Sequence, residues 1–219
     1  MSKKKLIHFQ ENLLFPHLFQ AKYHELITDH HLRLKWKQEY FQNTNPVILE
    51  LGCGKGEYTI GLAERSPDEN FIGMDVKGAR LWRGCKIVEE KHLNNVAFIR
   101  SQVDHITKFF GADEISEIWI TFPDPQVKKE RKRLTSPVFI EKYRKILIPN
   151  GLIHLKTDSF DLYTYTLGIL KRDNHPVLFS TDDLYHMQTI DDAGTIQTYY
   201  EKMWLEKGKK ICYLKFHIA

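Results

Sequence analysis

The segment Glu-Leu-Gly-Cys-Gly-Lys-Gly, residues 50–56, stands between two short apolar runs and indicates the class of fold. Before it comes Val47-Ile48-Leu49, which is rich in β-branched residues and typical of a buried strand. After it, residues 58–63 carry apolar side chains at helical spacing, and a second apolar run, residues 71–74, ends on Asp75. A strand, a glycine turn, a helix and a second strand with an acid at its tip form the βαβ unit of a nucleotide-binding domain.

The spacing of the glycines narrows the choice of nucleotide. A dinucleotide-binding fingerprint places its third glycine three residues after its second, whereas Gly54 and Gly56 are two apart and Glu57 holds the third position. Glu50, just before the loop, would repel a phosphate but attract a cationic ligand. The arrangement resembles motif I of S-adenosylmethionine-dependent methyltransferases, with a glycine turn in an unrelated α/β fold as the alternative. The resemblance implies a cofactor-binding set of Glu50, Gly52, Gly54 and Asp75.

Length and composition favour one soluble domain with an extension. The chain has 219 residues, of which 42% are hydrophobic, and no apolar run approaches the roughly 18 residues that cross a membrane. The basic N-terminus is not followed by an apolar signal segment. Three cysteines and the scattered histidines show no metal-binding spacing. We therefore expect a reduced, cytoplasmic protein with no metal, no membrane contact and no obligate protein partner.

Residues 1–45 form a basic and aromatic segment that differs from the rest of the chain. Residues 1–46 hold seven Lys and Arg against four Asp and Glu. The segment is too apolar for a disordered tail. We expect an N-terminal arm that packs on a domain of residues 46–219, with a helix around His31–Gln42.

From Pro46 onward, predicted strands and helices alternate. Strands are expected at 47–51, 70–74, 96–100, 116–121, 151–156, 177–181 and 211–217, and helices at about 56–65, 78–92, 136–146 and 159–172. Pro149-Asn150-Gly151 predicts a turn. This alternation indicates an α/β fold with a mostly parallel sheet covered by helices on both faces. The resemblance implies the Rossmann-like class I methyltransferase fold, with seven strands and an antiparallel last strand.

Polar residues follow the ends of the predicted strands. They are Glu50, Asp75, Gln102, Asp124 and Asp158. Ligands of open α/β sheets bind beyond the carboxyl ends of the strands, so these five groups are expected on one rim.

The fourth of these residues lies in Phe122-Pro123-Asp124-Pro125, where two prolines restrict the backbone around one acid. Five basic residues follow within Lys128–Arg133. A carboxylate beside a cationic loop suits an anionic substrate, with the phosphates held by charge and the acid facing a base. The alternative is that this run is a solvated surface.

Phe122-Pro123-Asp124-Pro125 is similar to the signature of the tRNA (guanine-N7-)-methyltransferase family, which methylates guanine 46 in the variable loop. The glycine loop, Leu155-Lys156-Thr157-Asp158, and Thr198-Tyr199-Tyr200-Glu201 followed by Gly208 agree with that family in the same order. Amino-group methyltransferases instead carry an Asn/Asp-Pro-Pro-aromatic run, which this chain lacks. The resemblance covers roughly residues 45–219.

The resemblance implies roles for individual residues. The cofactor, S-adenosylmethionine, would be held by Glu50, Gly52, Gly54, Asp75, Gln102 and Asp124. Asp124 would also be catalytic. Contacts to tRNA would come from Lys128, Asp158, Thr198 and Glu201. Two positions depart from the family: Gln102 replaces a common acid, and the loop after Asp124 is about two residues shorter.

The implied acceptor needs no general base, because guanine N7 keeps its lone pair at neutral pH. We therefore expect Asp124 to orient the base and to stabilise positive charge. Two other functions stay open: a methyltransferase of another RNA or a small molecule, and a non-catalytic RNA-binding protein. The second would be expected to have lost the cofactor acids, which are present. The sequence leaves the oligomeric state and the set of tRNA substrates undetermined.

Overall fold

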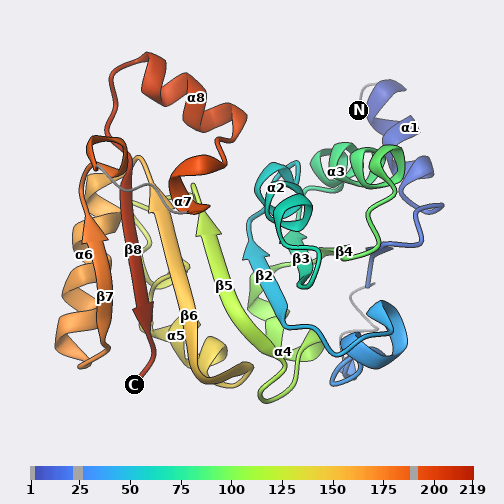
Figure 1. Cartoon of the computed structure of the whole chain (residues 1–219), viewed down its shortest axis with the longest axis horizontal. Helices are drawn as coiled ribbons and strands as arrows, with labels where there is room; N and C mark the ends of the chain where they lie inside the picture. The colour runs from blue at the N-terminus through green and yellow to red at the C-terminus, as the bar shows by residue number, and fades with distance from the viewer. Residues whose placement is uncertain (1–2, 22–26, 188–191) are drawn as a thin grey trace.

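A computed structural model describes residues 3–21, 27–187 and 192–219. In these residues eight strands form one sheet in the order β1-β4-β3-β2-β5-β6-β8-β7 (Figure 1). Neighbouring strands run parallel except that β8 is antiparallel to both β6 and β7. The strands are β1 (Leu18–Phe19), β2 (Val47–Leu51), β3 (Asn70–Asp75), β4 (Val96–Arg100), β5 (Ile115–Thr121), β6 (Leu147–Thr157), β7 (Val177–Thr181) and β8 (Cys212–His217).

Helices cover both faces of the sheet. One face carries α2 (Glu57–Arg65), α3 (Gly78–Lys91) and α7 (Asp192–Thr195), and the other carries α4 (Ile106–Phe109), α5 (Pro137–Arg144) and α6 (Phe160–Arg172). The helix α8 (Tyr199–Glu206) lies at the end of the sheet, on the side of α7. A further helix, α1 (Lys3–Glu11), packs on α3. Figure 1 shows α7 and α8 at the upper end of the sheet, toward which the β5 and β6 arrows point.

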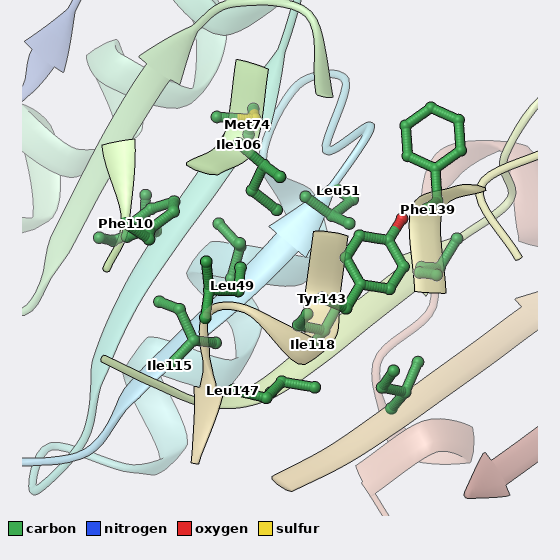
Figure 2. Close-up of a cluster of buried hydrophobic side chains, with 14 of the residues drawn as sticks. Leu49, Leu51, Met74, Ile106, Phe110, Ile115, Ile118, Phe139, Tyr143 and Leu147 are labelled. Carbon is green, nitrogen blue, oxygen red and sulfur yellow. The ribbon is translucent and has the colours of Figure 1, made fainter. Parts of the chain in front are cut away.

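Side-chain alternation along the strands divides the core into two clusters. In β2, Val47, Leu49 and Leu51 belong to the cluster under α4, α5 and α6, whereas Ile48 belongs to the cluster under α2 and α3. Figure 2 shows Leu49 and Leu51 in the first cluster, together with Tyr143 of α5. Because both faces are buried, β2 is apolar at every position but one.

The predicted alternation of strands and helices, the parallel sheet and the antiparallel last strand are confirmed. The prediction missed β1, which adds an eighth strand, and the helices α1, α4, α7 and α8. The helix expected over His31–Gln42 is only a π-helical turn, Trp36–Phe41. The segment Pro149-Asn150-Gly151, which was expected to form a turn, lies inside β6. The pairing register between β5 and β6 shifts at this segment.

The described part of residues 1–45 is attached to the sheet by its aromatic side chains; residues 1–2 and 22–26 lie outside the description. The ring of His8 stacks on Trp82 of α3 with centroids 3.8 Å apart. Trp36 is fully buried, and its indole nitrogen donates to the carbonyl of Phe109 at 2.9 Å. The Glu114 carboxylate accepts hydrogen bonds from the backbone nitrogens of Leu34 at 2.8 Å and Trp36 at 3.4 Å. The aromatic composition of this segment therefore reflects packing.

Glu50 is the one charged residue of β2, and its position in the strand points it toward α2. One carboxylate oxygen accepts from the backbone nitrogen of Thr59 at 2.8 Å and from the Thr59 hydroxyl, and the other accepts from the Thr121 hydroxyl at 2.5 Å. Glu50 thus joins β2, α2 and β5. Burial is the main cause that raises the pKa of Glu50, from 4.5 to about 7.

This raised pKa predicts a pH dependence of stability. Between pH 4.5 and about 7 the folded state keeps a proton that the unfolded state has released, so stability is lost as the pH rises through this window. Glu50→Gln removes this titration and keeps the shape of the side chain. The free energy of unfolding of the variant minus that of the native chain should rise by about 3 kcal/mol between pH 4.5 and 8, at about 1.4 kcal/mol per pH unit.

Urea denaturation of both proteins at several pH values measures that difference. Other titrating groups are common to the two proteins and cancel. Parallel stability curves would contradict the assignment.

Candidate functional site

Two adjoining cavities open at the carboxyl ends of the strands. The first, here called the α8 cavity, has a volume of about 450 Å³ and is lined by the glycine loop, Asp158 and residues of α8. The second, here called the Asp75 cavity, has a volume of about 530 Å³ and is lined by Asp75, Gln102 and the loop after β5. Both volumes lie in the usual range of small-ligand pockets. The edge of the sheet where a ligand site was predicted therefore carries two adjoining cavities.

The glycines of residues 50–56 serve two different purposes. Gly52 and Gly54 have positive φ angles of 74° and 59°, line the α8 cavity, and have open space where a Cβ would point. A Cβ on Gly56 would instead lie 2.5 Å from the ring of Phe98, so Gly56 is required for packing. The first two glycines leave the backbone exposed to a ligand.

Asp75 ends β3 and fixes the loop beside it. Its carboxylate accepts from the backbone nitrogen of Gly54 at 2.9 Å and from that of Lys77 at 2.7 Å. Asp75 and Gln102 both line the Asp75 cavity, as the sequence predicted for two residues at neighbouring strand ends. Glu50 lines the α8 cavity, but both of its oxygens already bind threonines.

Asp124 lies where the two cavities meet and lines both of them. The residues Phe122 and Gln126, on either side of Pro123-Asp124-Pro125, have left-handed φ angles of 48° and 46°. Such angles are strained for residues other than glycine and are common at functional sites. The carboxylate is exposed, and one oxygen accepts from the backbone nitrogen of Gln126 at 3.0 Å. The bent loop thus presents an oriented acid to the cavities.

The predicted substrate-binding residues differ in exposure. Asp158 and Thr198 line the α8 cavity, and Asp158 pairs with Lys209 at 3.0 Å. Thr198 caps α8 in a reciprocal capping box with Glu201. Glu201 itself is fully buried, so its carboxylate offers no exposed atom for the predicted contact with a substrate.

The cationic run after Asp124 also separates into parts. Lys128 and Lys129 are exposed on the outer part of the loop, whereas Arg131 and Lys132 line the Asp75 cavity. Arg133 is buried, pairs with Asp161 at 2.6 Å and lies over the ring of Tyr165 at 4.3 Å. Arg133 therefore belongs to the packing against α6 and does not contribute to a cationic surface.

Sequence reasoning missed several residues of the α8 cavity. They are Lys55, Lys77, Arg80 and Trp204. Lys55 and Lys77 stand within two residues of predicted ligands, and this proximity was the signal that could have found them. Arg80 and Trp204 are neither next to a predicted ligand nor part of a motif, and only the tertiary structure shows that they line the cavity.

The described residues contain no group of three or more His, Cys, Asp or Glu arranged to hold a metal ion. Within the same ranges, no helix is long and apolar enough to span a membrane.

Comparison with known proteins adds independent findings. Residues 44–214 match a family model described as a putative methyltransferase. The chain is 48% identical over 217 residues to a tRNA (guanine-N(7)-)-methyltransferase of Bacteroides fragilis, covering 99% of this chain and 86% of that protein. It is 49% identical over 222 residues to a protein of the same name from Christiangramia forsetii, covering 99% of each.

Among solved structures, the 16S rRNA methyltransferase KamB superimposes with a TM-score of 0.65 at 10% identity, covering 85% of this chain and 93% of KamB. At that identity the likeness concerns the fold alone. The two sequence relatives and the family model go further: the chain has the class I methyltransferase fold and belongs to the tRNA (guanine-N7-)-methyltransferase family.

Proposed function

We propose that this chain transfers the methyl group of S-adenosylmethionine to N7 of a guanine in tRNA, at position 46 of the variable loop. Family membership gives the reaction class. The observation that carries the proposal is the place of Asp124, which lines both cavities. A cofactor in one cavity and a base in the other would meet beside this carboxylate.

The residues of the Asp75 cavity suit the cofactor. Asp75 can accept hydrogen bonds from ribose hydroxyls, and the amide oxygen of Gln102 can accept one from an adenine amino group. The open space over Gly52 and Gly54 allows a ligand to approach the backbone of the adjoining loop. When bound, S-adenosylmethionine supplies a methyl group on positively charged sulfur. The carboxylate of Asp124, which lines both cavities, favours such a cation at their junction.

The chemistry asked of the side chains is orientation and charge stabilisation. Guanine N7 carries an available lone pair, so no side chain has to remove a proton. Methylation at N7 makes the purine ring cationic, and the fixed carboxylate of Asp124 would stabilise that developing charge. Asp158 can accept hydrogen bonds from the guanine N1–H and amino group, which would orient N7.

The outer surface suits a polyanion. Lys128 and Lys129 are exposed in a loop whose other residues line the Asp75 cavity, and Lys209 pairs with Asp158, which lines the α8 cavity. Contacts between such cations and phosphates position a nucleic acid without reading its sequence. We infer that the substrate is a folded tRNA in the cytoplasm and that residues 46–219 form the catalytic domain, with residues 1–45 stabilising it.

The function is tested by the identity of the methylated nucleoside. Incubation with S-adenosylmethionine and tRNA should give 7-methylguanosine at position 46. A tRNA with 7-deazaguanosine at that position keeps the N1 proton and the amino group but lacks the N7 lone pair. It should bind with similar affinity and accept no methyl group. Methylation of the deaza substrate, or of another RNA in preference to tRNA, would overturn the proposal.

Two isosteric substitutions should separate catalysis from cofactor binding. Asp124→Asn removes the charge beside the reacting base, and kcat should fall about 10²–10³-fold, the scale of losing one oriented electrostatic group. Asp75→Asn makes the same chemical change at the other acid of the rim. It should raise KM for S-adenosylmethionine about tenfold and keep most of kcat at saturation, because it weakens binding.

Steady-state kinetics with both substrates varied measure these effects. A loss of kcat in Asp75→Asn that matches the loss in Asp124→Asn would remove the distinction between the two acids.

The exposed part of the cationic loop should determine the salt dependence of tRNA binding. In Lys128→Gln/Lys129→Gln, the slope of log K against log salt concentration should flatten by about 1.5, the value for two lost phosphate contacts. S-adenosylmethionine affinity should stay unchanged. The matched control is Lys171→Gln. Lys171 is exposed at the C-terminal end of α6, the end away from the cavities, and its replacement should keep the native slope. Equal slopes in all proteins would show that the run is only a solvated surface.

A further inference from the structure

The position of α8 defines one wall of the α8 cavity, because Thr198, Tyr200 and Trp204 all line it. Figure 1 shows that α8 lies beyond the end of the sheet and is not packed along a strand. A short helix in such a place needs specific attachments. What holds α8 therefore determines the shape of the proposed base-binding site.

The main attachment is a buried ion pair between Lys156 of β6 and Glu201 of α8. Both side chains have no exposed surface, and the ammonium nitrogen lies 2.6 Å from a carboxylate oxygen. The Tyr185 hydroxyl donates to the same oxygen at 2.6 Å. Lys156 also donates to the backbone carbonyls of Ala193 and Ile196, the latter at 3.1 Å. One lysine thus holds α8 and the turn that precedes it.

Side-chain alternation explains why Lys156 can do this. Ile153 and Leu155 face the cluster under α4, α5 and α6, so Lys156 points to the opposite face, toward α7 and α8. Two residues later the strand has ended, and Asp158 lines the α8 cavity. The proposed base-binding acid therefore directly follows the strand that carries the lysine.

The first turn of α8, which carries Glu201, also reaches the cofactor side of the site. The backbone nitrogen of Tyr199 donates to Glu57 at 3.2 Å, and the ammonium of Lys55 lies 5.0 Å from the centre of the Tyr199 ring. Arg80 of α3 donates to the Tyr200 hydroxyl at 3.4 Å. These contacts are exposed and weaker than the buried pair. The helix bridges β6 and the glycine loop, with its rigid attachment at β6.

We propose that Lys156 and Glu201 are positioning residues, which hold α8 as a wall of the tRNA-base cavity, and that Glu201 acts through Lys156 and does not touch tRNA. This inference rests on the proposed function for its substrate. A buried charge that loses its partner is strongly destabilising locally. Removing either member should therefore release α8, while Asp75 and Gln102 on the neighbouring cavity keep their places.

A double-mutant cycle distinguishes this role from direct contact. Glu201→Gln should raise KM for tRNA about tenfold in the native background and by less than about twofold in the Lys156→Met background, because the two residues act as a unit. A direct contact between Glu201 and tRNA would give the same ratio in both backgrounds. That result would overturn the proposal.

Two further readouts exclude general loss of folding. General unfolding lowers apparent kcat through the active fraction, whereas a misplaced wall raises KM for tRNA and keeps the dissociation constant for S-adenosylmethionine within about twofold. Hydrogen exchange should accelerate over residues 193–206 and remain native over 47–75. Unchanged exchange over 193–206 in both single variants would refute the anchoring role.

Tyr185→Phe supplies a milder variant if circular dichroism shows that Glu201→Gln or Lys156→Met is unfolded. It removes one hydrogen bond to Glu201 and leaves both charges in place. KM for tRNA should rise about threefold, the scale of one hydrogen bond to a charged group. A native KM with native hydrogen exchange would count against the proposal. The hydrogen-exchange measurements need no methyl acceptor, so they test the anchoring role by itself. Failure of the proposed function is seen separately, when the native protein produces no 7-methylguanosine in tRNA.

Discussion

The burial of both faces of a parallel sheet is the constraint on which the rest of this molecule depends. Leu49 and Ile48 of β2 point into different apolar clusters, and the same alternation recurs along β3 and β4. Polar side chains can then reach solvent only at the ends of the strands, where they avoid the free-energy cost of burial. Since the strands that carry the site are parallel, their carboxyl ends share one edge, and this brings Asp75, Asp124 and Asp158 together.

Two ionisable side chains break this rule by lying on a buried face. Glu50 lies in β2 and Lys156 in β6, the two strands on either side of β5. Both side chains face the side of the sheet that carries α2 and α7. Each is enclosed by polar partners: threonines for Glu50, and Glu201 with backbone carbonyls for Lys156. A buried charge without such partners would be costly. These two residues join the rigid sheet to the segments that form the site.

The loop between β5 and α5 shows how one sequence run takes on several tasks. Its first part bends at two left-handed residues and presents Asp124 to both cavities. Its middle exposes Lys128 to solvent, and its end turns Arg133 inward against Asp161. A charged segment that looks uniform in sequence is therefore divided by the backbone into an oriented acid, an exposed cationic surface and a packing contact.

The sequence by itself determined the α/β class, most strand and helix positions, and the rim residues Asp75, Gln102, Asp124 and Asp158, because alternation and glycine spacing are local signals that also fix the strand ends. It did not determine β1, since a two-residue strand is defined only by its partner β4. Nor did it reveal that Glu201 is buried or that Arg80 and Trp204 reach the cavity. Those facts depend on contacts between residues far apart in the chain. Burial is a property of the whole packed molecule, so only the tertiary structure decided which charges became surface and which became anchors.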